Sequence, residues 1–229
     1  MVANLFTTGK SEPDTTPPLT AEALLPALTS TEPMRPFTAA YLIGRVRSDD
    51  AATDQSLTQS LETLLTQSQD GANPTTANDV LIEAAMSLAL RGNIERAHKT
   101  LLNLLHSPDP LGDQYKAAFY LAELGDPSGY PALLATLQSN IPHYRLMALR
   151  HALAFHQYDG QPVKNTPIDV LQLLTARLKD PDPIVRSEVP FYLEELHPPN
   201  LRELLQPIEQ SDPSHQVRTA ARIVLDRNS

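Results

Sequence analysis

From about Thr20 onward, the chain alternates between short apolar segments and polar breaks. Within the segments, apolar residues recur three or four positions apart, as they do along one face of an α-helix. The breaks come every dozen or so residues and contain Pro, Gly, Asp or Asn, which punctuate helices. Period-two alternation is weak and there is no Asn-Gly hairpin turn. The pattern therefore predicts helices and no extended sheet.

One apolar frame recurs along the chain. The segments 185–196 and 217–225 both read Val-Arg, then a small or medium apolar residue four positions after the Val, then a Leu eight positions after it. We call the residue at the fourth position the anchor. A spacing near 32 residues predicts stacked helix pairs, because one pair cannot bury its apolar face alone. The six anchors are Ala39, Ala84, Ala117, Ala148, Val189 and Ala221, at intervals of 45, 33, 31, 41 and 32 residues.

These features predict an all-α, right-handed α-solenoid of about six helix pairs, forming a single domain over 20–229. The polar, Pro-rich residues 1–19 are expected to form a flexible arm. Longer insertions are expected near 48–55, 69–77 and 157–166. The first helices of the pairs are predicted near 20–29, 55–68, 93–107, 127–139, 166–179 and 198–210. The second helices are predicted near 33–47, 78–91, 112–125, 142–157, 183–196 and 214–227.

Local sequence signals support several of these helix starts. Asp126 and Asp182 each precede a Pro, which suits a capping carboxylate followed by the first helical residue. The segment 166–169, Thr-Pro-Ile-Asp, resembles a capping box with Asp in place of Glu. Pro190 falls inside a predicted helix, where it removes a backbone hydrogen bond. We interpret Pro190 as a kink that sets local curvature.

Composition narrows the function classes. The net charge of −9 argues against binding to a phosphate backbone. The chain has no Cys, so disulfides and thiolate chemistry are excluded. No apolar run approaches the length of a membrane span, and the first residues lack the pattern of a signal peptide. We therefore expect a cytoplasmic protein.

Two segments resemble a known family. The segment 124–137, Leu-Gly-Asp-Pro-Ser-Gly-Tyr-Pro-Ala-Leu-Leu-Ala-Thr-Leu, is similar to the short bacterial HEAT-like repeat of phycobilin lyases. The segment 178–186, Leu-Lys-Asp-Pro-Asp-Pro-Ile-Val-Arg, is similar to its inter-helix turn. The resemblance is clearest over 79–227. The sequence departs from it at Ala152, where the family has Leu, at Pro190, and at the turn 139–144, which lacks Asp-Pro.

The resemblance implies a fold more than a function, because such repeats serve many roles. The family includes scaffolds, chaperone-like factors and bilin lyase subunits. The leading hypothesis is a protein-binding adaptor or an assembly factor that uses a concave surface. The alternative is a subunit of a phycobilin lyase or a chromophore-maturation factor, which would need a partner subunit and a bilin. A helical-repeat DNA glycosylase is disfavoured, because the expected groove carries Glu123, Glu188 and Glu195.

Three side chains are candidate partner-binding residues. Tyr120, His151 and Tyr192 each follow an anchor by three positions, one in each of three neighbouring repeats. On stacked second helices they would form a ridge on the concave side, and Tyr is enriched at binding hot spots. The competing interpretation is that the three residues pack between repeats.

Four charged residues are candidates for a structural role in the turns. Arg186 and Arg218 occupy matching places, and Asp180 and Asp212 lie six residues before them. They form either an exposed charged ladder or, as we favour, links between successive turns.

The sequence shows no catalytic, metal or cofactor site. It contains no Gly-x-Ser-x-Gly and no phosphate-binding loop, and we interpret Ser128 as an ordinary residue of a first helical turn. His151 and His156 are five positions apart, or about 140° around a helix, which does not suit a shared metal ion. The acidic pairs Asp49-Asp50 and Glu194-Glu195 are interpreted as solvated faces.

Overall fold

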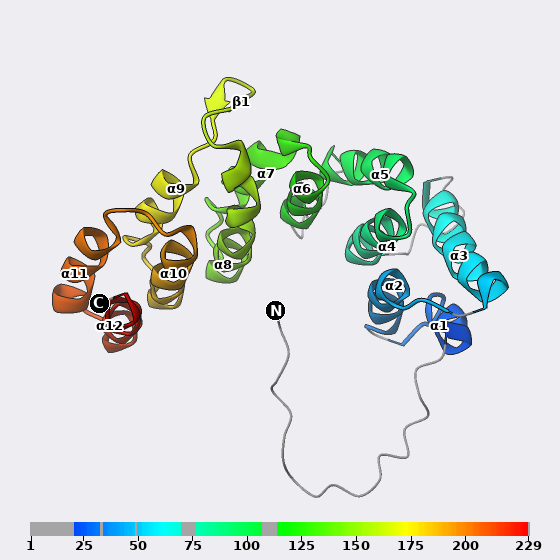
Figure 1. Cartoon of the computed structure of the whole chain (residues 1–229), viewed down its shortest axis with the longest axis horizontal. Helices are drawn as coiled ribbons and strands as arrows, with labels where there is room; N and C mark the ends of the chain where they lie inside the picture. The colour runs from blue at the N-terminus through cyan, green and yellow to red at the C-terminus, as the bar shows by residue number, and fades with distance from the viewer. Residues whose placement is uncertain (1–20, 33, 49, 70–76, 107–113, 229) are drawn as a thin grey trace, which may run out of the picture.

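The computed structural model describes residues 21–32, 34–48, 50–69, 77–106 and 114–228. In these residues twelve α-helices form six antiparallel pairs that stack into an arc (Figure 1). The all-α solenoid predicted from the sequence is confirmed. The predicted arm at 1–19, most of the insertion at 69–77 and Asp49 lie outside the described residues.

The pairs follow the predicted order along the chain. The first three are α1 (Ala21–Ala27) with α2 (Arg35–Arg45), α3 (Ala51–Gln69) with α4 (Asn78–Leu90), and α5 (Ile94–His106) with α6 (Gln114–Glu123). The last three are α7 (Tyr130–Thr136) with α8 (Pro142–His151), α9 (Val170–Arg177) with α10 (Pro183–Leu196), and α11 (Leu201–Ser211) with α12 (His215–Arg227).

The second helix of each pair contacts the second helix of the next, from α2 through to α12. These even-numbered helices line the inner side of the arc, and the odd-numbered helices lie outside them (Figure 1). All six anchors are buried, with at most 2% of their surface exposed. The anchors therefore face the interior between the two layers of helices.

Two buried clusters make up the core. One joins the first three pairs, and the other runs from α6 to α12. Helix α6 contributes to both, through Ala117 and Leu121 on one side and through Tyr115, Ala118 and Ala122 on the other. The small side chains of α6 allow the helices on either side to approach closely.

Two predicted helix starts were wrong, because polar side chains cap other positions. The region 48–55 is mostly helical, since Asp50 accepts hydrogen bonds from the amides of Ala52 and Thr53 and so starts α3. The helix expected from residue 166 begins at Val170, where Asp169 is the cap and accepts from the Gln172 amide. Asp126 and Asp182 cap helical turns as predicted.

The insertion near 157–166 carries short elements that the sequence pattern did not reveal. A 3₁₀-helix (Ala152–Tyr158) continues α8, so the helix expected to reach residue 157 ends at His151 as an α-helix. A small hairpin follows, with β1 (Pro162–Val163) antiparallel to β2 (Thr166–Pro167). Lys164 and Asn165 join the strands with φ of 48° and 66°, which is the backbone of a tight primed turn.

Candidate partner-binding face

The even-numbered helices present one exposed face to the inside of the arc. A residue two positions beyond an anchor is rotated about 200° from it, and therefore points away from the buried layer. Residues five or one before the anchor, and six after it, lie within about 60° of that direction. We call these four positions on the even helices the inner face. The residues two beyond the anchors are all exposed or half-buried: Tyr41, Met86, Phe119, Arg150, Phe191 and Ile223.

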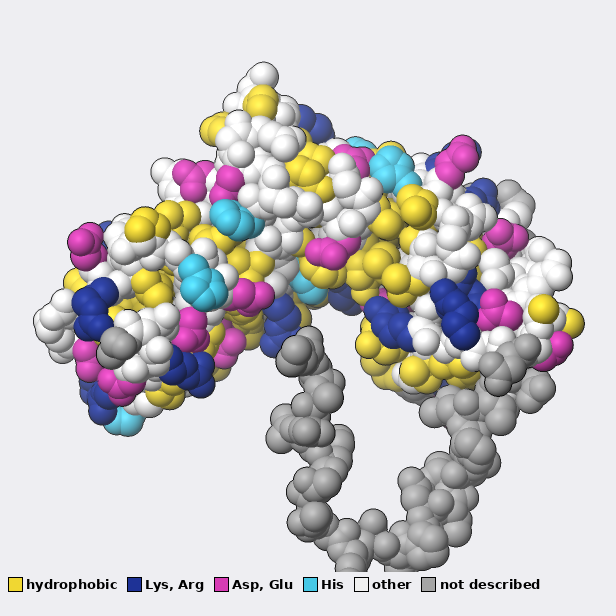
Figure 2. All heavy atoms as spheres, in the orientation of Figure 1, with side chains coloured by type: hydrophobic (Ala, Val, Ile, Leu, Met, Phe, Trp, Pro, Cys, Tyr) yellow, Lys and Arg dark blue, Asp and Glu magenta, His cyan; other side chains and the backbone are white. Residues whose placement is uncertain are grey.

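Exposed hydrophobic side chains are concentrated on the inner face. Seven large hydrophobic residues are exposed among those described, and four of them lie on it: Tyr41, Leu90, Ile184 and Ile223. Of the other three, Met34 and Ile141 precede α2 and α8 and so lie outside those helices, and Ile94 is the first residue of α5. Figure 2 shows hydrophobic side chains along the inner edge of the arc, interrupted by charged ones. Exposed apolar surface gathered in this way is typical of interaction sites.

Tyr120, one of the three predicted ridge residues, is half-buried and committed to an internal contact. Its hydroxyl donates a 2.7 Å hydrogen bond to Glu83 Oε1 on the preceding even helix, α4. Burial, together with this bond, raises the pKa of Tyr120 well above its ordinary value. Tyr120 therefore keeps its proton, donates a hydrogen bond to the carboxylate and joins two repeats.

His151 also reaches back to the preceding repeat. Its ring centroid lies 4.3 Å from that of Phe119 and 5.7 Å from that of Tyr115, both on α6. Burial, together with the nearby charges of Arg150 and Lys116, lowers the pKa of His151 to about 4. The imidazole is therefore neutral near pH 7 and packs as an aromatic ring.

Tyr192 repeats the arrangement one pair further along. Its ring packs against the C-terminal core cluster, and burial raises its pKa, although a hydrogen bond from Arg150 on α8 opposes that rise. All three predicted residues thus contact the repeat before their own. Their role in partner binding stays a prediction.

Sequence reasoning missed Phe119 and Phe191, which are half-buried, as Tyr120 and Tyr192 are. The signal was present in the repeat frame. Three positions beyond an anchor is a rotation of about 300°, which leaves a side chain beside the buried layer, whereas two positions is about 200°. Phe119 and Phe191 therefore lie nearer the centre of the inner face than Tyr120 and Tyr192 do.

The charged residues of the turns link successive repeats. Arg186 donates from Nε and Nη2 to the carboxylate of Asp212 at 2.9 and 3.0 Å, and from Nη1 to the Asp180 carbonyl at 2.8 Å. Arg218 donates to the Asp212 carbonyl at 2.6 Å. Arg145, which the sequence reasoning did not single out, binds Asp180 in the same way at 2.9 and 2.7 Å.

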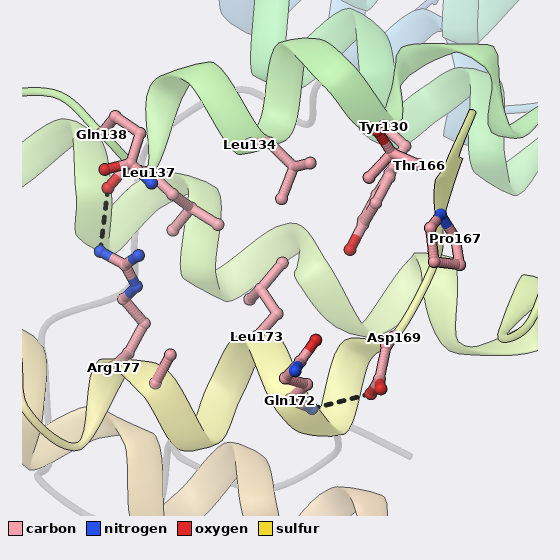
Figure 3. A pocket seen from close by; sticks show the side chains of 11 residues that line it. Tyr130, Leu134, Leu137, Gln138, Thr166, Pro167, Asp169, Gln172, Leu173 and Arg177 are labelled. Carbon is pink, nitrogen blue, oxygen red and sulfur yellow. Dashed lines mark hydrogen bonds between the residues drawn. The ribbon is translucent and has the colours of Figure 1, made fainter. Parts of the chain in front are cut away.

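The outer layer of helices contains a groove. It lies between α7 and α9, has a volume of about 360 Å³, and is bordered by the hairpin residues Thr166 and Pro167 (Figure 3). Two of its polar side chains serve the fold: Asp169 caps α9, and Arg177 donates from Nη1 to the Leu137 carbonyl at 3.1 Å. Arg177 Nε is buried without a hydrogen-bond partner among the described residues.

The residues that the structure describes also bear on metal binding and membrane insertion. They contain no group of three or more His, Cys, Asp or Glu side chains placed to hold a metal ion. None of their helices is long and apolar enough to cross a membrane. Ser128 lies in the 3₁₀ turn Pro127–Gly129, where its amide donates to the Asp126 side chain.

No protein-family model and no curated protein matches the chain. Solved structures do match. An engineered protein is 19% identical, with a TM-score of 0.50, over 90% of this chain and 95% of its own. The complex of CpcE and CpcF of phycocyanin lyase from Nostoc sp. PCC7120 is 22% identical, with a TM-score of 0.49, over 93% of this chain and 79% of its own. At these identities the likeness is one of fold, so the lyase-subunit alternative stays a prediction.

Proposed function

We propose that this protein is a binding adaptor or assembly factor that holds a partner protein along its inner face. The observation that carries the proposal is the gathering of exposed hydrophobic residues there, on four of the six even helices: Tyr41, Leu90, Ile184 and Ile223. Leaving such side chains in water is unfavourable by about 25 cal/mol per Å² of apolar surface. A partner that covers them recovers this free energy.

The half-buried aromatic residues strengthen this interpretation. Phe119 and Phe191 lie between the exposed positions and are supported from behind by packed neighbours, with Phe119 against His151. Rigid aromatic side chains in partly desolvated surroundings are typical of binding hot spots. An extended segment or a helix of the partner could lie along the arc and contact several repeats at once.

Site-specific photo-crosslinking tests the proposal with a matched pair of positions. Ile184 on the inner face and Ile94 on the outer helix α5 are exposed to almost the same extent, 53% and 55%. We would place a photoreactive phenylalanine analogue at each position in the full chain and irradiate it in an extract of the source cells. We expect a discrete crosslinked protein from position 184, and the same protein from position 119. Position 94 should not give it.

Affinity for the crosslinked partner completes the test. Ile184→Asp should weaken binding by about tenfold or more, because losing a hot-spot side chain from an interface costs more than about 1 kcal/mol of binding free energy. Ile94→Asp should change it little. Equal crosslinking or equal loss of affinity at the two positions would place the binding surface elsewhere and refute the proposal.

A further inference from the structure

Glu83 has a buried carboxylate oxygen without a hydrogen-bond partner among the described residues. Counted as whole residues, four charged residues are buried among those described: Glu83, Arg145, Asp180 and Asp212. The last three are ion-paired in the turns. Glu83 is 6% exposed and has no ion pair, and its Oε2 is buried without a hydrogen-bond partner among the described residues. A buried charge is costly unless it is paired, so this oxygen requires an explanation.

The surroundings of Glu83 suit a cation. Its other oxygen, Oε1, accepts from the Tyr120 hydroxyl at 2.7 Å, which holds the carboxylate in place. Tyr41 and Arg45 on α2 lie close enough to Tyr120 to act on it electrostatically. The Arg45 guanidinium carbon sits 3.6 Å from the centroid of the Tyr41 ring. This part of the inner face therefore already holds one cation against an aromatic ring, an attraction that is general for such pairs.

We propose that Glu83 and Tyr120, with the Tyr41 ring beside them, form a receptor for one basic side chain of the partner, a lysine ammonium or an arginine guanidinium. The inference rests on the proposed function, since it specifies the chemistry of the segment that the inner face holds. Glu83 stands one position before its anchor, Ala84, and is therefore on the inner face. Its free oxygen accepts a hydrogen bond from the incoming cation, which takes the place of Arg45 beside the Tyr41 ring.

Charge complementarity supports a basic partner. The protein carries a net charge of −9, which attracts a cationic segment over long range. Glu123, Glu188 and Glu195 also occupy inner-face positions and are exposed or half-buried. Arg45, Lys116, Arg150 and Arg227 stand on the same face, so a basic segment must align its charges with the glutamates. This requirement gives the interaction a defined register.

Nuclear magnetic resonance on the full chain tests the receptor with simple probes. n-Butylammonium stands for the lysine side chain, n-propylguanidinium for arginine, and 1-butanol for a neutral chain of similar size. We expect both cations to shift the ring signals of Tyr120 and Tyr41 saturably, and 1-butanol not to. Glu83→Gln should weaken cation binding about tenfold or more, because it removes a charge-assisted hydrogen bond. Glu95→Gln, at an exposed position of the outer helix α5, is the control and should leave the Tyr120 response unchanged.

Two further measurements separate binding from folding. Glu83→Gln should not lower the melting temperature, because glutamine still accepts from Tyr120 and removes a buried charge. Arg45→Gln should strengthen cation binding, since it removes a competing positive charge. A lower melting temperature for Glu83→Gln, or cation binding that this change leaves intact, would overturn the receptor. Crosslinking at position 184 that survives such a result would leave the proposed function standing.

Discussion

Tyr120 contributes to this fold mainly through its hydroxyl, which is the one hydrogen-bond donor that Glu83 has among the described residues. Tyr120→Phe keeps the ring and leaves both oxygens of a buried carboxylate without a donor. We expect the free energy of unfolding to fall by about 1–3 kcal/mol, the cost of an unsatisfied buried group. Urea unfolding measures this change. Tyr41→Phe, at a ring that is 40% exposed, is the control and should change stability by no more than about 0.5 kcal/mol.

His151 makes the stability depend on pH. Its folded-state pKa of about 4 lies below the ordinary value of about 6.5. Between these values the unfolded chain binds a proton that the folded chain does not, so stability falls as the pH drops from about 6.5 toward 4. We expect a loss of about 1–3 kcal/mol over this range.

The control for this dependence is His151→Phe, which keeps an aromatic ring against Phe119 and cannot titrate. Thermal unfolding of both proteins between pH 4 and 7 should show a flatter stability curve for the variant. Parallel curves would mean that His151 is solvated enough to titrate normally.

The repeat frame in the sequence singled out positions on the even helices, but it did not show which contacts their side chains make. The spacing from the anchors singled out Tyr120, His151 and Tyr192. Their contacts depend on the preceding repeat, and the rotation between stacked helices brings Glu83, Phe119 and Arg150 to them. That rotation is a tertiary property, so a single repeat frame could not show it. Sequence reasoning did not single out Glu83, which stands in a largely apolar helix.

Between neighbouring elements, the Arg–Asp pairs of the turns are well-buried polar links. Arg145 and Asp180 have side chains that are 7% and 0% exposed, and two hydrogen bonds join them. Although burial raises the pKa of Asp180, the bond from Arg145 and the other donors outweigh it and hold the pKa below its ordinary value. The stability from this pair is therefore complete above about pH 3.9 and is lost as the pH falls through the depressed pKa.

Asp180→Ala should destabilise the protein by about 3–5 kcal/mol, because it leaves the Arg145 guanidinium buried and unpaired. The matched control is Glu209→Ala, which breaks the pair with Arg222 at 3.6 Å, where the side chains are 32% and 55% exposed. An exposed pair contributes about 0–1 kcal/mol. Urea midpoints for both variants decide the question. Equal small losses would show that the turn pairs contribute little to the stacking of the repeats.

The order of the helices was predictable because capping residues and the spacing of apolar residues act locally. Asp126 and Asp182, for example, cap the helical turns that follow them. The failures were also local. Asp50 was interpreted as part of an acidic pair, yet its carboxylate starts α3. The hairpin turn uses Lys164 and Asn165 in a backbone conformation that usually selects glycine, so no sequence signal marked it.

Helix α6 joins the two core clusters of the molecule, because it contributes buried residues to both. Ala117 belongs to the N-terminal cluster and is 0% exposed, while Ala118 on the same helix belongs to the C-terminal cluster. In a solenoid each repeat contacts mainly its neighbours, so a local defect weakens the adjacent repeats more than the distant ones. Ala117→Leu inserts a larger side chain into the N-terminal cluster and should cost about 1–3 kcal/mol through overpacking.

We also expect the loss of stability in Ala117→Leu to be confined to the repeats next to α6. Native-state hydrogen exchange should show protection falling in α4 and α6 and remaining close to that of the parent in α11 and α12, four or more helices away from the defect. Ala135→Leu, at an exposed position of α7, is the control and should leave both regions unchanged. A uniform loss of protection along the chain would mean that the solenoid unfolds as one cooperative unit. An unchanged urea midpoint for Ala117→Leu would mean that α6 does not join the two clusters as closely as its buried alanines indicate.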